Sequence, residues 1–285
     1  MPLLPPSVFY IVAAPCSAVA LILNLRLLII YLYSKNQDKK HYLTLFLTLS
    51  LHILFDISSL VYAPYCLIGM FQSAWNPSLV FWSGSVTFAS VTAIIACNCC
   101  ITLDRIFAMR KPIVYAIRYS RPCGILTVVL MAASFSVAFV RHYIGFIPPL
   151  SSQPSFLNVM SPDIMRSSAL IKTVMSFVNL GFTLLFLREM RLFLRNLQST
   201  QIHQNIKSAN QVIILQVSVE ALFMIFPDVV AVPLSYYGIS LPQIIGSFPA
   251  TLSSAYTLVC ALLMTGKLRK DRMLQNISTV AVKSV

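Results

Sequence analysis

The sequence predicts an all-α membrane protein, a seven-transmembrane helix bundle with the N-terminus outside the cell and the C-terminus in the cytosol. Of its 285 residues, 58% are apolar and only 10% are charged, whereas soluble domains carry roughly 25% charged residues. Seventeen of the 21 Lys and Arg residues lie in four short stretches between long apolar runs. Short cytosolic loops collect Lys and Arg, so these stretches belong on one side of the membrane. The four stretches are residues 34–41, 105–122, 188–207 and 267–285.

A span of about 20 apolar residues crosses the hydrocarbon core. Seven such spans nearly exhaust the chain, so we expect a single domain, residues 1–285. Residues Met1–Leu25 carry no charge and begin the first span. The uncharged stretch Ile57–Leu103 is too long for one crossing, so the turn-forming run Gln72–Pro77 must divide it. The predicted spans are residues 7–33, 42–70, 78–103, 124–140, 167–187, 209–237 and 243–265.

The later spans are separated by basic or proline-rich segments. A loop with four prolines between residues 148 and 162 follows span four. Arg188, Arg191 and Arg195 recur every third or fourth residue and predict that span five continues as a helix into the cytosol. Span seven is followed by a short basic tail, residues 267–285, which we expect to begin with an amphipathic helix at the inner leaflet.

The placement of charge and histidine excludes several function classes. The net charge of +13 sits at the membrane edges, which favours lipid headgroups and an acidic or amphipathic cytosolic protein over nucleic acid. The four histidines are isolated, so we expect no metal site and no cofactor. No serine-protease elbow or paired intramembrane aspartates are present, which disfavours an enzyme. A multispan transporter or ligand-gated channel is the alternative, although no internal repeat is visible and the chain has only 8 Gly.

The cytosolic end of span three carries the most informative motif. Residues Leu103–Pro112 read LDRIFAMRKP, which resembles the rhodopsin-like receptor signature of an acidic residue, Arg, a hydrophobic residue and a later Pro. Asn24, Asp56 and the Phe226-Pro227 pair match further landmarks of that superfamily. The chain further resembles the nematode serpentine chemoreceptors, of class xa or class bc, in the segment from Thr48 to Asp56 and in its compact loops.

This resemblance implies a receptor that binds a small environmental ligand and activates a heterotrimeric G protein. It implies a multi-pass protein of the plasma membrane and suggests the sensory cilium as its compartment. Asp104 is expected to neutralise Arg105 at rest, and an open bundle would free Arg105 to meet the G protein. The residues assigned to G-protein coupling and the ionic lock are Asp104, Arg105, Ile106 and Pro112, and those assigned to the activation core are Asn24, Asp56, Phe226, Pro227 and Tyr256.

The sequence departs from the superfamily pattern at two places. Val80 stands where the superfamily has a disulfide cysteine, and the loop after span four has no cysteine. Span seven lacks the Asn-Pro-x-x-Tyr motif and reads Ser253-Ser254-Ala255-Tyr256. We expect Tyr256 to serve part of that role.

Ionisable residues inside the predicted spans are functional candidates, because burying them is expensive. Asp56 either pairs with Arg26 or forms a sodium site, two alternatives that the sequence leaves open. Glu220 is expected to pair with a polar side chain of span three. Asp228 follows the Pro227 kink, and it either forms a structural ion pair with Lys172 or contacts the ligand.

Further ligand-binding candidates line the outer half of span three, and their spacing is equally compatible with core packing. Thr87 stands where amine receptors place a carboxylate, which disfavours a monoamine ligand held in that way. Span seven has no lysine before Lys267, which disfavours a retinal Schiff base. The ligand-binding candidates are Trp82, Thr87, Phe88, Val91, Lys172 and Asp228.

Overall fold

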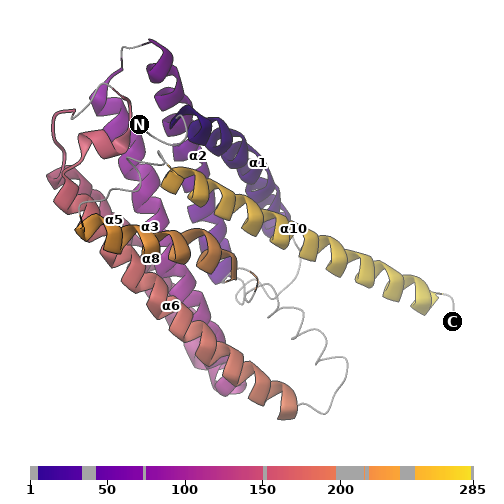
Figure 1. Cartoon of the computed structure of the whole chain (residues 1–285). Helices are drawn as coiled ribbons and strands as arrows, with labels where there is room; N and C mark the ends of the chain where they lie inside the picture. The colour runs from indigo at the N-terminus through magenta and orange to yellow at the C-terminus, as the bar shows by residue number, and fades with distance from the viewer. Residues whose placement is uncertain are drawn as a thin grey trace.

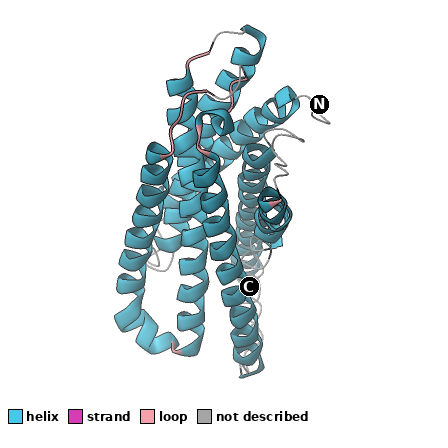
Figure 2. Cartoon of the chain, turned by 60° about the vertical axis from the view of Figure 1, so that its left-hand side comes forward, coloured by secondary structure: helices cyan, strands magenta, loops and turns pink. Residues whose placement is uncertain are grey.

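The computed structural model describes residues 6–33, 43–72, 75–149, 153–196, 215, 218–237 and 248–283, and nearly all of them are helical. Long helices lie side by side and form a bundle (Figures 1 and 2). Within the described residues, six of these helices are long and apolar enough to cross a membrane. The all-helical fold predicted from the sequence is confirmed. The six helices are α1 (Pro6–Tyr33), α2 (Leu43–Gln72), α3 (Pro77–Arg110), α5 (Ser120–Ile144), α6 (Pro162–Asn196) and α10 (Phe248–Lys283).

Short elements connect or interrupt the long helices. The sixth expected span, residues 209–237, begins outside the described residues, and its described second part is helical. A π-helical turn lies at each of two places, between α3 and α5 and directly before α8. The short elements are α4 (Pro112–Val114), the π-helix η2 (Tyr115–Tyr119), the 3₁₀-helix η3 (Phe156–Val159), the π-helix η4 (Ala221–Ile225) and α8 (Phe226–Tyr236).

Local sequence signals explain where α3 begins and ends. The Asn76 side chain accepts a hydrogen bond from the Ser78 backbone N–H at 2.9 Å, and Pro77 follows as the first helical residue. Asparagine is a preferred N-cap, and proline at the next position loses no hydrogen bond. At the other end, Lys111 leaves the helical conformation before Pro112, as residues that precede proline commonly do.

α3 lies at the centre of the bundle and packs against α2, α5 and α6. α1 packs against α2 and α10. Two large apolar clusters surround α3. One, at the end of the bundle that we call the Phe156 end, contains Tyr62, Phe81 and Phe156; the other, nearer the end that we call the Arg105 end, contains Phe55, Ile94 and Tyr256.

The last helix differs from the expectation of a separate amphipathic helix after span seven. α10 runs without interruption from Phe248 to Lys283 and extends beyond the other helices (Figure 1). Its membrane-length apolar part is Phe248–Gly266. The sequence that follows Gly266 contains no proline and many good helix formers, so nothing local ends the helix there.

Candidate functional site

The Phe156 end of the bundle is closed by the loop after α5. Phe156 is fully buried, and its ring stacks on Phe88 of α3 with a centroid distance of 5.0 Å. Its backbone N–H donates a hydrogen bond to the Tyr62 hydroxyl at 3.1 Å. The ring lies directly against Gly84, where an added Cβ would come within 2.5 Å of it. An aromatic anchor therefore fixes this loop to α3, at the end of the bundle where the sequence lacks the superfamily's disulfide.

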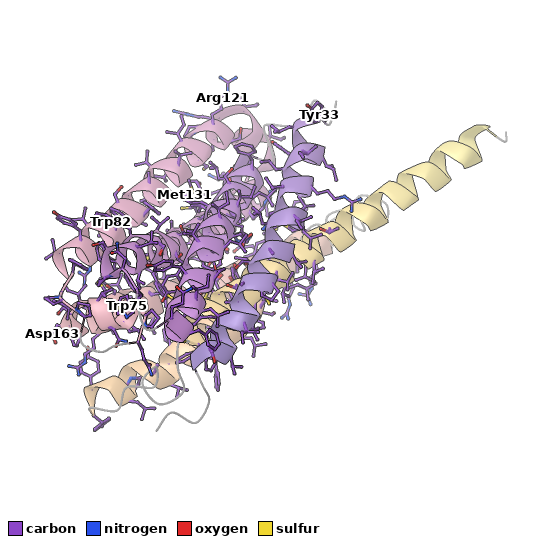
Figure 3. All side chains as sticks on the ribbon, turned by 90° about the horizontal axis from the view of Figure 1, so that it is seen from above. Tyr33, Trp75, Trp82, Arg121, Met131 and Asp163 are labelled. Atoms are coloured by element: carbon purple, nitrogen blue, oxygen red, sulfur yellow. The ribbon has the colours of Figure 1, made fainter. Side chains whose placement is uncertain are left out.

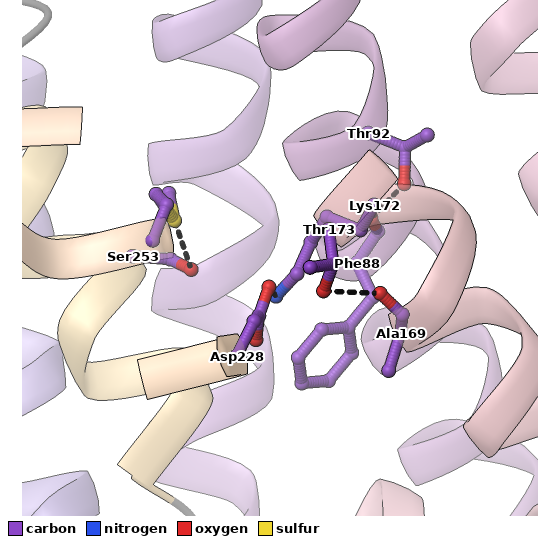
Figure 4. A network of polar contacts seen from close by, with 8 residues as sticks. Phe88, Thr92, Ala169, Lys172, Thr173, Asp228 and Ser253 are labelled. Carbon is purple, nitrogen blue, oxygen red and sulfur yellow. Dashed lines mark hydrogen bonds and ion pairs between the residues drawn. The ribbon is translucent and has the colours of Figure 1, made fainter. Parts of the chain in front are cut away.

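Lys172 of α6 and Asp228 of α8 form an ion pair, with 2.9 Å between Nζ and Oδ2 (Figure 4). Their side chains are 19% and 12% exposed. The structure thus brings together the two residues for which the sequence suggested either an ion pair or ligand contact. Thr173 follows Lys172 on α6, and its hydroxyl donates to the Ala169 carbonyl at 2.9 Å (Figure 4).

The candidates of α3 do not all point toward this pair. The Thr87 hydroxyl donates to Ser58 Oγ at 3.1 Å and so ties α3 to α2. Val91 is buried in the cluster with Tyr256. Trp82 is 45% exposed and lies at the rim of the bundle against Phe139 and Tyr143 of α5 (Figure 3). Phe88, the fourth candidate, stacks on Phe156 and contacts Tyr62 of α2.

Deeper in the bundle, a polar cluster centred on Glu220 joins four segments; we call it the Glu220 hub. Glu220 Oε2 accepts hydrogen bonds from Asn98 Nδ2 of α3 and Asn179 Nδ2 of α6, both at 2.8 Å. Asn98 also donates to the Tyr256 hydroxyl of α10 at 2.9 Å. The expectation that Glu220 pairs with a polar side chain of span three is confirmed. The members of the hub are Asn98, Asn179, Glu220 and Tyr256.

A second buried cluster lies around Asp56 on α2. Asn24 of α1 donates to Asp56 Oδ2, and Thr257 of α10 donates to Oδ1, both at 3.0 Å. Arg26 is exposed and forms no ion pair with Asp56 in the described part of the chain. Because Tyr256 and Thr257 are neighbours in sequence, α10 links the Asp56 cluster directly to the Glu220 hub.

In the sixth predicted span, the side of the helix that faces the bundle core changes at the π-helix η4. Met224 and Ile225 are buried, whereas Phe226 is 65% exposed. A π-helical turn inserts an extra residue and rotates all the residues that follow around the helix axis. The structure therefore directs Phe226, the first residue of α8, away from the core, and Pro227 follows as the second residue of α8.

The receptor-like motif lies at the Arg105 end. Asp104 is 3% exposed, and the Tyr115 hydroxyl donates a hydrogen bond to its Oδ1. Arg105 is half-buried and close enough to Tyr115 to act electrostatically on its hydroxyl. Burial and the bond to Asp104 raise the pKa of Tyr115, which keeps it a donor. Ile106 is also buried.

Two further features complete this end. Pro112 is the first residue of α4, directly before the π-helix that carries Tyr115. Arg110 of α3 forms an ion pair with Glu189 of α6 at 2.7 Å. The ends of α3 and α6 are therefore held together beside the Asp-Arg motif.

Sequence reasoning missed several residues of these clusters. Asn98 and Asn179 are single polar residues within apolar runs, a signal that could have found them. Tyr115 and Phe156 lie in the short segments that connect the long helices, where hydropathy gives no indication of burial. In the described residues, no group of three or more His, Cys, Asp and Glu side chains could hold a metal ion.

The comparison with protein families agrees with the geometry. Residues 4–147, just over half of the chain, match the model of the family described as serpentine type 7TM GPCR chemoreceptor Srbc. No curated protein matches the sequence significantly. The match covers α1 to α5, including the Asp104-Arg105 motif. Of the two classes that the sequence suggested, it selects bc, and it identifies a class of receptors that are not enzymes. The chain belongs to the Srbc family of serpentine seven-transmembrane GPCR chemoreceptors.

Proposed function

We propose that this protein is a chemosensory receptor of the plasma membrane that binds a small environmental ligand and activates a heterotrimeric G protein. The whole chain acts as one seven-span domain. The N-terminus and the Phe156 end face outward, and the Arg105 end and the basic tail face the cytosol. This orientation is supported by the distribution of Lys and Arg.

The observation that carries the proposal is a series of buried polar contacts between the two ends. The Lys172–Asp228 pair lies near the Phe156 end, and the Glu220 hub lies deeper, eight residues earlier on the same segment. Asn98 of the hub precedes Arg105 by seven residues on α3. Seven residues are about two helical turns, or about 10 Å along one face. The proposed ligand site at Lys172 and Asp228 is thus connected to Arg105 through side chains that pack between the helices.

The π-helix η4 and Pro227 lie between Asp228 and Glu220 and provide a hinge. Proline lacks the N–H that would continue the helical ladder, so the segment bends there at low cost. A ligand that contacts Asp228 or Lys172 would favour one position of α8 over another. The population of the bundle would then shift toward a state in which the hub and the Arg105 end are open.

At the Arg105 end, the proposal assigns distinct tasks to neighbouring residues. Tyr115 holds Asp104, and Arg110 holds Glu189 of α6. When these contacts loosen, Arg105 can donate hydrogen bonds to carbonyl groups of the G protein, because its guanidinium is permanently charged. Asn24, Asp56 and Tyr256 form the packed core that carries the change between helices.

A cell-based second-messenger assay tests the proposal. Cells that express the protein are exposed to a panel of volatile and water-soluble small molecules, and the response to an active compound is compared between the wild type and Arg105→Ala. We expect Arg105→Ala to abolish the response at unchanged surface expression. Arg26→Ala, the same substitution at an exposed position on α1, should respond as the wild type does. Full signalling by Arg105→Ala would contradict the proposal.

A further inference from the structure

Glu220 poses a charge problem that the receptor function alone does not explain. Its side chain is 1% exposed, and Oε1 has no hydrogen-bond partner in the described part of the chain. A buried carboxylate without an opposite charge is far more costly than a neutral polar group. Some positive charge must therefore compensate it.

Among the described residues, the surrounding helices do not supply that charge. In the regions that the structure describes, no Lys, Arg or His side chain lies against Glu220, and the ionisable groups that face it are neutral thiols and a phenol. Arg105 and Lys172 lie toward opposite ends of the bundle. The side chains that face Glu220 are Asn98 and Cys99 of α3, Asn179 of α6, and Tyr256 and Cys260 of α10.

The geometry distinguishes between a proton and a metal cation. Asn98 and Asn179 both direct an N–H group at Oε2, so the hub presents hydrogens rather than lone pairs to the carboxyl. A metal cation needs several oxygen lone pairs, and the N–H groups would repel it. Oε2 is already fixed as the acceptor, which leaves Oε1 as the oxygen that can carry a proton.

We propose that Glu220 is a proton-binding site of this receptor, protonated on Oε1 when the hub is closed. Opening the hub admits water; the Oε1–H bond breaks, the proton passes to that water, and Glu220 remains as a carboxylate. The proton is then a ligand of the closed state and shifts the population toward it. The link to signalling rests on the proposed function, whereas proton binding itself does not.

Thermal unfolding of the purified full-length protein in lipid nanodiscs tests proton binding without a G protein. The closed bundle binds a proton that the opened or unfolded one releases, so its stability should fall as pH rises. One linked proton changes the folded-to-unfolded ratio by up to about tenfold per pH unit. We expect this dependence in the wild type above about pH 5, where glutamate in the unfolded chain is ionised, and its loss in Glu220→Gln.

Two control variants test whether the pH dependence of stability comes from Glu220. Asp56→Asn makes the same carboxyl-to-amide change in the other buried cluster, and His52→Gln removes a fully buried histidine that contacts Tyr256. Both should retain the part of the pH dependence that Glu220→Gln loses. An equal pH dependence in the wild type and Glu220→Gln would overturn the proposal. A sodium site would also overturn the proposal. It would be indicated if sodium stabilised the wild type more than an organic cation at equal ionic strength, and if Glu220→Gln abolished that difference.

Infrared spectroscopy keeps the proposal testable if Glu220→Gln does not fold. The protonated carboxyl group has a carbonyl band that a carboxylate lacks. In the Asp56→Asn variant at neutral pH, a buried acid band that exchanges slowly with deuterium is expected from Glu220. Absence of any such band would refute protonation of Glu220, and it would leave G-protein coupling through Arg105 unaffected.

Discussion

At the scale of single residues, buried hydrogen bonds and ion pairs join helices that otherwise pack through apolar side chains. The Tyr115–Asp104 bond joins η2 to the end of α3, the Lys172–Asp228 pair joins α6 to α8, and Glu220 joins its own segment to α3 and α6. Each such partner is costly to lose, because the remaining polar group is left buried and unsatisfied. Substitutions at these positions should therefore change the balance between states of the bundle.

Tyr115→Phe removes the hydroxyl that donates to Asp104 while keeping the ring. One lost hydrogen bond of about 1 kcal/mol changes an equilibrium about fivefold. We expect basal second-messenger signalling per surface receptor to rise by about that factor. Tyr119→Phe, at an exposed position of the same π-helix, is the matched control and should leave signalling unchanged. Equal basal signalling in both variants would show that this bond does not restrain the receptor.

Asp228→Asn should shift the potency of an active ligand without abolishing surface expression. It removes the negative charge of the ion pair and preserves the shape of the side chain. Dose–response curves from the same second-messenger assay measure the effect. Curves identical to those of the wild type would remove Asp228 from the ligand site.

A double-mutant cycle with Lys172→Gln and Asp228→Asn separates the ion pair from its members. We expect the double variant to be more stable than the sum of the two single effects predicts, by about 0.5–3 kcal/mol. The Asp163–Arg166 pair on the same helix, with 3.8 Å between its atoms and largely exposed side chains, should show no measurable coupling. Thermal unfolding in nanodiscs gives both values. Coupling at the exposed pair as large as at Lys172–Asp228 would contradict this account.

At the scale of elements, hydropathy and turn chemistry could predict the long helices, because a bilayer forces apolar runs into helices of sufficient length. They could not predict the π-helices η2 and η4. One extra residue in η4 alters which side chains face inward, so Phe226 is exposed although its motif suggests a core position. The ion pair between Asp228 and Lys172 could be suggested from the sequence, because few charged residues lie within the predicted spans. Phe156 could not be placed, since nothing local marks a loop phenylalanine as buried.

Gly84→Ala tests how the loop is attached to α3. The added Cβ would lie 2.5 Å from Cδ2 of Phe156, so the ring and its loop must move. Overpacking of this kind costs about 1–3 kcal/mol, and we expect thermal unfolding at a lower temperature. Gly181→Ala is the matched control, because no atom lies within 4 Å of its added Cβ. It should leave the unfolding temperature unchanged or raise it slightly. A Gly84→Ala variant as stable as Gly181→Ala would contradict the packing.

At the scale of the whole molecule, the separation of charge is the dominant feature. In the sequence, Lys and Arg gather in the four stretches 34–41, 105–122, 188–207 and 267–285, whereas the Phe156 end is closed by aromatic packing. The inner surface of the plasma membrane is negative and attracts such basic segments. This asymmetry orients the proposed protein in the membrane, so that the proposed ligand site faces outward and the proposed G-protein site faces the cytosol.

The most direct measurement is therefore the side of the membrane on which each terminus lies. Epitope tags at both ends of the full-length protein are stained with antibody in intact and in permeabilised cells. The account predicts that the N-terminal tag stains on intact cells and that the C-terminal tag stains only after permeabilisation. Two tags accessible from the same side would mean an even number of crossings, and the proposed path from ligand to G protein would be wrong.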